Sequence, residues 1–110
     1  DSCTAIARAH DLDVRVSWAE EFPVTVNDPG SVRLVASSAR SLGLDVVEAR
    51  VPFAWSEDFG WFTREAPGAL FGLGAGETVP ALHHPGYDFP DGIIEAGVGV
   101  LVSVVRDILG

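Results

Sequence analysis

Residues 75–91 of this chain read Ala-Gly-Glu-Thr-Val-Pro-Ala-Leu-His-His-Pro-Gly-Tyr-Asp-Phe-Pro-Asp. The segment holds His83 and His84, two of the three histidines of the chain. Connections of this length are uncommon inside compact domains, and those that are not disordered are usually functional. Because Leu82, Tyr87 and Phe89 supply apolar anchors, we expect an ordered loop that presents a histidine to a site.

The segments on either side of this loop predict a strand before it and a helix after it. Residues 69–74 are short, apolar and glycine-bearing, which is typical of a buried strand. Residues 92–109 are rich in β-branched side chains, but Glu95, Ser103 and Arg106 follow a helical stripe. We therefore expect a helix that is apolar nearly all round and mostly buried.

Upstream, further helices and strands are predicted in alternation. Residues 2–10 have the apolar spacing of a helix, whereas residues 13–18 alternate between apolar and polar side chains, as in a strand. Asp28 and Pro29 suit the start of a second helix, since aspartate caps the first turn and proline fits the first helical position. Gly43 is expected to end that helix.

The middle of the chain completes an α/β pattern. A strand is predicted over residues 44–51, and Ser56-Glu57-Asp58-Phe59 starts another helix with Ser56 as its capping residue. The alternating order predicts an α/β fold. Several apolar side chains of the two middle helices are expected to face the core: Val32, Val35, Ala36, Ala39, Leu42, Phe59 and Phe62.

Composition restricts the classes of partner. The 110 residues suit one globular domain, and the net charge of −9, with no lysine, argues against a nucleic-acid surface. Since no apolar run could span a bilayer and no signal peptide is visible, we expect no membrane partner and a cytoplasmic location. One cysteine, Cys3, excludes an internal disulfide. The chain begins at Asp1 and contains no methionine, so a piece of a longer protein is expected.

The residues themselves leave several chemistries open. In extended backbone the adjacent His83 and His84 would point to opposite sides, so at most one is expected to bind a metal, and both are equally well explained as ordinary loop residues. Glu57 and Asp58 would form a general base with its partner, or simply favour a helix N-terminus. A catalytic zinc needs about three protein ligands, more than this chain offers by itself.

A nucleophile enzyme using Ser56 or Cys3 is the weaker alternative. No histidine lies near Ser56 in the sequence, and no Gly-x-Ser-x-Gly motif surrounds it, so a helix cap explains it better. Cys3 is expected to be a small buried residue.

Three motifs, together with residues 23–29, resemble the C-terminal part of the aminoacylase/hippurate-hydrolase family of metallo-amidohydrolases. The motifs are Ser-Glu-Asp-Phe at 56–59, Pro-Gly-Ala-Leu-Phe-Gly-Leu-Gly at 67–74 and Leu-His-His-Pro-Gly-Tyr-Asp-Phe at 82–89. The resemblance implies a zinc-peptidase-like catalytic domain, with a mixed sheet flanked by helices. Such a domain binds two divalent metals, zinc or manganese, with cobalt and nickel as alternatives. It also implies an inserted lid domain that mediates dimerisation.

Carried over by position, the resemblance gives His83 the role of a metal ligand. It assigns positioning roles near the active site to Ser56, Glu57, Asp58 and His84. The general-base glutamate of the family would lie upstream of this chain, so no catalytic residue is expected here.

The resemblance also implies a division of the chain and an activity. Residues 1–26 would be the end of the lid and dimerisation domain, and residues 27–110 the C-terminal part of the catalytic domain. The intact protein, a homodimer, would hydrolyse the amide bond of N-acyl amino acids, small amides or peptides by metal-activated water, whereas this chain alone would be inactive. The alternative is a non-catalytic interaction or structural module, that is, a degenerate or split family member, with residues 13–18 as an edge strand. The acyl group, the amino acid and the metal stay open.

Overall fold

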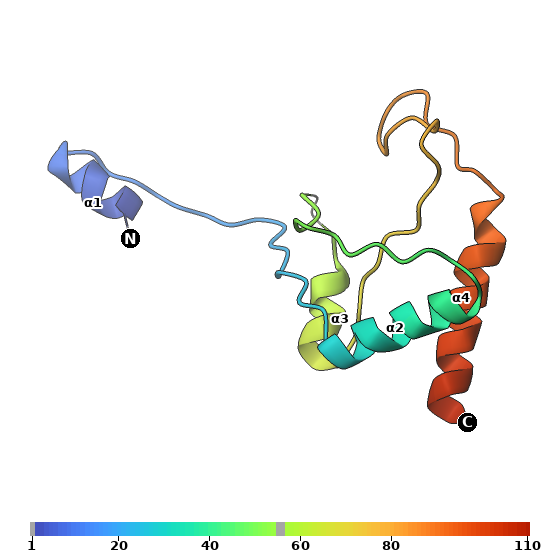
Figure 1. Ribbon diagram of the computed structural model, residues 1–110. Helices are drawn as coiled ribbons and strands as arrows, with labels where there is room; N and C mark the ends of the chain where they lie inside the picture. The colour runs from blue at the N-terminus through green and yellow to red at the C-terminus, as the bar shows by residue number, and fades with distance from the viewer. Residues whose placement is uncertain (1, 55–56) are drawn as a thin grey trace.

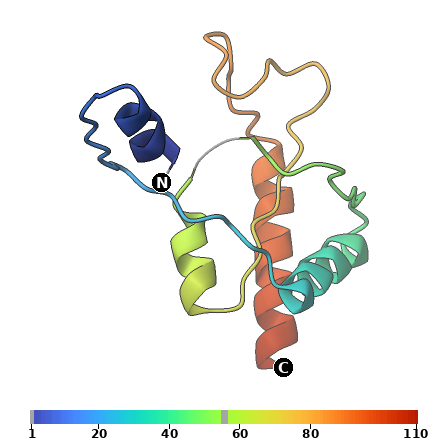
Figure 2. The ribbon, with the colours of Figure 1, turned by 90° about the vertical axis from the view of Figure 1, so that its left-hand side faces the viewer.

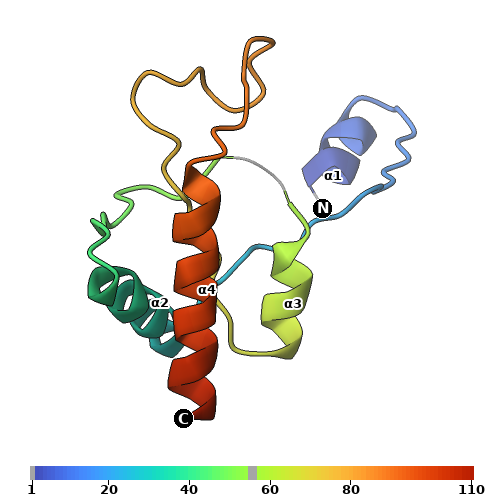
Figure 3. The same ribbon diagram turned by 90° about the vertical axis from the view of Figure 1, so that its right-hand side faces the viewer.

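The computed structural model describes residues 2–54 and 57–110 (Figure 1). These residues form four helices, which are α1 (Ser2–Ala9), α2 (Pro29–Ser41), α3 (Phe59–Glu65) and α4 (Ile93–Leu109). Helix α2 packs against α4, and α1 lies apart at the end of an extended segment. Figures 2 and 3 show α2 and α3 on either side of α4, with the histidine-bearing loop projecting beyond its N-terminal end.

All four predicted helices are confirmed, and α2 has the predicted ends. The Asp28 side chain accepts a hydrogen bond from the Ser31 backbone N–H at 2.7 Å, and Pro29 occupies the first turn. Gly43 follows the helix with a φ of 75°, in the left-handed region that glycine adopts without strain. Helix α3 starts after Asp58, which makes no side-chain capping bond, and the predicted cap Ser56 lies outside the described residues.

The predicted mixed sheet, and with it the α/β fold class, is wrong for the part of the chain that the structure describes. Residues 13–18, 44–51 and 69–74 have no strand structure, and the regular elements are four helices. A helix forms its backbone hydrogen bonds internally, whereas a strand needs a neighbouring strand to receive them. Alternation predicted the strand at 13–18 and a short apolar run the strand at 69–74, but the three predicted runs do not pair with one another.

Burial is also far lower than the sequence predicts. Among the described residues, Val100 is the one buried large hydrophobic side chain, and Ser38 is the one buried polar side chain. The expectation that α4 is mostly buried is therefore wrong. Val32, Leu42 and Phe62 were expected in the core, but they are 42%, 48% and 67% exposed. Seven apolar side chains of α4 are 41–79% exposed: Ile94, Val98, Leu101, Val102, Val105, Ile108 and Leu109.

The dimensions of the chain agree with this low burial. The radius of gyration is 19.8 Å, whereas a compact domain of this length has about 13 Å. Contact between α2 and α4 includes a hydrogen bond of 3.0 Å from the Ser38 hydroxyl to the Asp107 carboxylate. None of the helices in the described ranges combines the length and the hydropathy needed to cross a membrane.

Candidate functional site

His83 lies at the centre of a β-turn in the projecting loop. The backbone N–H of His84 donates to the Ala81 carbonyl at 2.9 Å, which closes a four-residue turn with Leu82 and His83 at its centre. His83 has a φ of 70°, the positive value that the third position of a type II turn requires. Glycine usually occupies such a position, and histidine is among the other residue types that are enriched there.

A second turn follows at once and shares His84 with the first. The backbone N–H of Tyr87 donates to the His84 carbonyl at 2.8 Å, and Pro85 occupies the second position, which its fixed φ favours. His83 and His84 therefore do not lie in extended backbone, and the alternation that applies to extended backbone does not apply to them. The direction of each ring is set by two consecutive turns, and not by the alternation of side chains along a strand.

The ring of His84 takes part in this second turn. Its Nδ1 accepts a hydrogen bond from the Gly86 backbone N–H at 3.0 Å. In a neutral imidazole one nitrogen carries the proton and the other accepts, so an accepting Nδ1 places the proton on Nε2. A protonated Nε2 has no lone pair for a metal. By contrast, the exposed ring of His83 has no hydrogen-bond partner within the described ranges.

A complete metal centre is not found in the described part of the chain. No three side chains of the metal-ligating types (His, Cys, Asp, Glu) are grouped there closely enough to hold an ion. A hydrolytic zinc needs about three protein ligands. The described residues can therefore supply one imidazole ligand to a metal site, but they cannot form the whole site.

Glu57, a candidate for a positioning role, is occupied at both carboxylate oxygens. Its Oε1 accepts from the Thr25 hydroxyl at 2.6 Å, and its Oε2 accepts from the Phe59 backbone N–H at 2.7 Å. Glu57 thereby joins the segment before α2 to the first turn of α3. Neighbouring Asp58 is exposed and makes no capping bond. Of these two carboxylates, Glu57 connects distant parts of the chain and Asp58 does not.

Residues 23–28 are held against residues 60–70 at two further places. The Asp28 backbone N–H donates to the Gly68 carbonyl at 2.9 Å. Gly60 is buried, and a β-carbon there would collide with the carbonyl oxygen of Pro23. Sequence reasoning missed Thr25 and Asn27, whose partners lie 32 and 43 residues away, and no periodic signal links positions so far apart.

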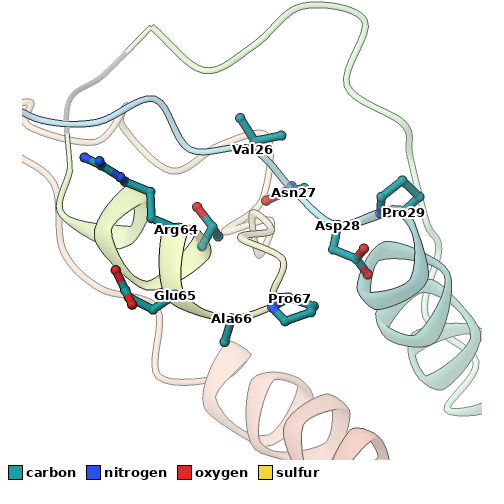
Figure 4. Close-up of a pocket in the computed structure, with 9 residues that line it drawn as sticks. Val26, Asn27, Asp28, Pro29, Arg64, Glu65, Ala66 and Pro67 are labelled. Atoms are coloured by element: carbon teal, nitrogen blue, oxygen red, sulfur yellow. The ribbon is translucent and has the colours of Figure 1, made fainter.

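A shallow depression of about 430 Å³ lies between the segment before α2 and the end of α3 (Figure 4). Figure 4 shows the Arg64 and Glu65 side chains pointing away from Asp28. The Arg64 guanidinium lies 5.1 Å from the centroid of the Trp61 ring, in cation–π contact. The depression is lined by Val26, Asn27, Asp28, Pro29, Thr63, Arg64, Glu65, Ala66 and Pro67.

Asp28 is the titratable group of this depression with a perturbed pKa. Hydrogen bonds from Ser31, chiefly from its backbone N–H, hold the pKa of Asp28 below its usual value of 3.8. The Asp28 carboxylate is thus committed to capping α2, and the other carboxylate that lines the depression, Glu65, points away from it. Of the predicted active-site residues that the structure describes, namely Glu57, Asp58, His83 and His84, none lines it.

Comparison with known proteins gives one family and two relatives. The model of Peptidase family M20/M25/M40 matches residues 7–107. Over its whole length the chain is 26% identical to an N-acetyldiaminopimelate deacetylase of Lactobacillus helveticus (strain DPC 4571), of which it covers 29%. It is also 26% identical over 61 residues, 56% of the chain, to an uncharacterized hydrolase of Staphylococcus epidermidis (strain ATCC 12228 / FDA PCI 1200), of which it covers 16%. No solved structure matches. The chain thus spans less than a third of either relative.

Proposed function

The chain belongs to Peptidase family M20/M25/M40, and from this membership we propose that the protein containing it is a metal-dependent amidohydrolase. Its substrates would be N-acyl amino acids or similar small amides and peptides. The name of the Lactobacillus relative supports this class, since removal of an N-acetyl group is amide hydrolysis. The aminoacylase/hippurate-hydrolase type is the finer proposal, and it rests on the three motifs in the second half of the chain.

In this proposal the chain supplies one metal ligand, His83. The observation that carries the assignment is the contrast between the two rings. His83 is exposed without a hydrogen-bond partner in the described ranges, whereas Nδ1 of His84 accepts from Gly86. Divalent metals, zinc or manganese with cobalt or nickel as alternatives, would activate water for attack on the amide carbonyl. The other ligands and the general-base glutamate would come from parts of the protein outside this chain.

The proposal extends to the division of the chain and to three further residues of the site. Residues 1–26 would belong to a lid and dimerisation domain of a homodimer, and residues 27–110 to the catalytic domain. Glu57, Asp58 and His84 would position the site, with Glu57 acting through its bonds to Thr25 and Phe59. The cytoplasmic location expected from the sequence also remains a prediction.

Exchange of His83 for alanine in the full-length protein tests the proposal. We expect the H83A variant to lose bound metal, measured by plasma mass spectrometry, and to lose hydrolysis of an N-acetyl amino acid. The H84A variant should lose less of either, because His84 is not assigned as a ligand. Metal content and turnover at the wild-type level in H83A would rule out His83 as a ligand.

A second candidate, a non-catalytic interaction module, is favoured by one observation, the large exposed apolar surface of α4. It is separated from the first by measuring metal content, amide hydrolysis and molar mass in solution for the full-length protein. Self-association without metal or hydrolysis would support the module, and stoichiometric metal with turnover would exclude it.

A further inference from the structure

We propose that His84 is a positioning residue, whose ring Nδ1 accepts a hydrogen bond inside the second of two consecutive turns and so holds His83 in its left-handed conformation. The inference deepens the proposed function and rests on it, because His83 is the residue being positioned. In this role both ring nitrogens of His84 are occupied, since Nδ1 accepts from Gly86 and the ring proton is then on Nε2. His84 is therefore not available as a metal ligand.

The geometry concentrates three hydrogen bonds on His84. Its backbone N–H donates to Ala81 in the first turn, its carbonyl accepts from Tyr87 in the second, and its ring accepts from Gly86. His84 is thus the last residue of one turn and the first residue of the next. Any rotation of its backbone disturbs both turns together. The ring contact with Gly86 opposes that rotation, as Asn and Asp side chains do when they bond the backbone two residues on.

Gly86 is fitted to this contact. A β-carbon at position 86 would lie 3.3 Å from His84 Nδ1 and 3.5 Å from its Cε1, close enough to press on the ring. Pro85 fixes the φ of the residue between them. The His-Pro-Gly segment therefore brings one ring nitrogen to one backbone N–H, and it leaves His83, one residue earlier, with a positive φ of 70°.

Two substitutions of His84 separate the positioning role from the loss of an imidazole. The amide oxygen of asparagine lies as many bonds from the backbone as Nδ1, whereas that of glutamine matches Nε2. H84N therefore keeps an acceptor for Gly86, and H84Q moves it out of place. H84A removes it altogether.

The test uses the full-length protein and has two readouts. Titration with Zn²⁺ should show H84N close to wild type, whereas H84Q and H84A bind about tenfold more weakly, the scale of a lost outer-shell hydrogen bond. Hydrogen exchange of the Gly86 amide should be slow in wild type and H84N and faster in H84Q and H84A. Selective ¹⁵N-histidine labelling should show an unprotonated Nδ1 at His84.

The outcomes are distinct. Equal Zn²⁺ affinity in H84N and H84Q, or a protonated Nδ1, would overturn the positioning role. The H83A variant tests the proposed function separately, because full Zn²⁺ binding in H83A would contradict His83 as a ligand. In that case the hydrogen exchange of Gly86 and the ¹⁵N-histidine labelling would still decide the role of His84.

Discussion

The side-chain amide of Asn27 forms two hydrogen bonds with the backbone of Leu70, although 43 residues separate them. Its Nδ2 donates to the Leu70 carbonyl at 2.8 Å, and its Oδ1 accepts from the Leu70 N–H at 2.8 Å. One side chain thus serves both backbone groups of a residue, as a neighbouring strand would. Leu70 begins the run that leads into the loop with His83, so Asn27 helps to fix where that loop starts.

Exchange of Asn27 for aspartate should destabilise the protein. Aspartate has the same shape but cannot donate, and its charge would face the Leu70 carbonyl. Loss of this bond should lower the free energy of unfolding of the full-length protein by about 1 kcal/mol, measured by denaturant titration. N27A, which removes both bonds, should cost at least as much. A wild-type stability for both variants would show that the pair contributes nothing.

Removal of the Glu57 carboxylate should also be costly. E57A leaves the Thr25 hydroxyl and the Phe59 N–H without their acceptor and should lower the free energy of unfolding by about 1–3 kcal/mol. D58A is the matched control, because the adjacent Asp58 is exposed and makes no capping bond, and it should change stability little. The interpretation of Glu57 as a link fails if both variants behave alike in thermal unfolding.

A methyl group at position 60 should be poorly tolerated. The β-carbon of alanine in G60A would collide with the Pro23 carbonyl, so the segment before α2 must shift away from α3. Overpacking of this kind costs about 1–3 kcal/mol. G74A is the control, since nothing lies within 4 Å of a β-carbon built at Gly74. Equal melting temperatures for the two variants would contradict the close approach at Gly60.

Acid should weaken the start of α2 through Asp28. Hydrogen bonds from Ser31 lower the folded-state pKa of Asp28 below 3.8. Its stabilising effect is therefore fully present above pH 3.8 and is lost as the pH falls through the lower folded-state pKa. D28N retains an acceptor for the Ser31 N–H and cannot titrate, so the slope of stability against pH below pH 4 should be smaller in D28N. An unchanged slope would mean that Asp28 does not contribute.

The features that the sequence predicts correctly are local ones. Asp28, Pro29 and Gly43 mark the ends of α2 because capping and the left-handed turn involve neighbours within a few residues. The predicted strands failed because their hydrogen bonds require partners that local pattern does not identify. Contacts such as Thr25 with Glu57 have no sequence signature at all.

The histidine loop lies between these cases. Pro85-Gly86 is a strong local turn signal, so the second turn was accessible from the sequence. This signal argues against extended backbone at His83 and His84. The ring contact of His84 with Gly86 and the positive φ of His83 needed coordinates, because histidine adopts a positive φ more often than most residues but still in few cases.

The scarcity of buried side chains has a calorimetric consequence for this 110-residue stretch. Heat-capacity change and denaturant m value both scale with the surface that unfolding newly exposes. With Val100 and Ser38 as the buried hydrophobic and polar side chains of the described residues, unfolding exposes less new surface than it does in a compact domain of this length. In isolation, residues 1–110 should lose their structure gradually on heating. Calorimetry should then record a broad, shallow rise in heat capacity and no sharp endotherm.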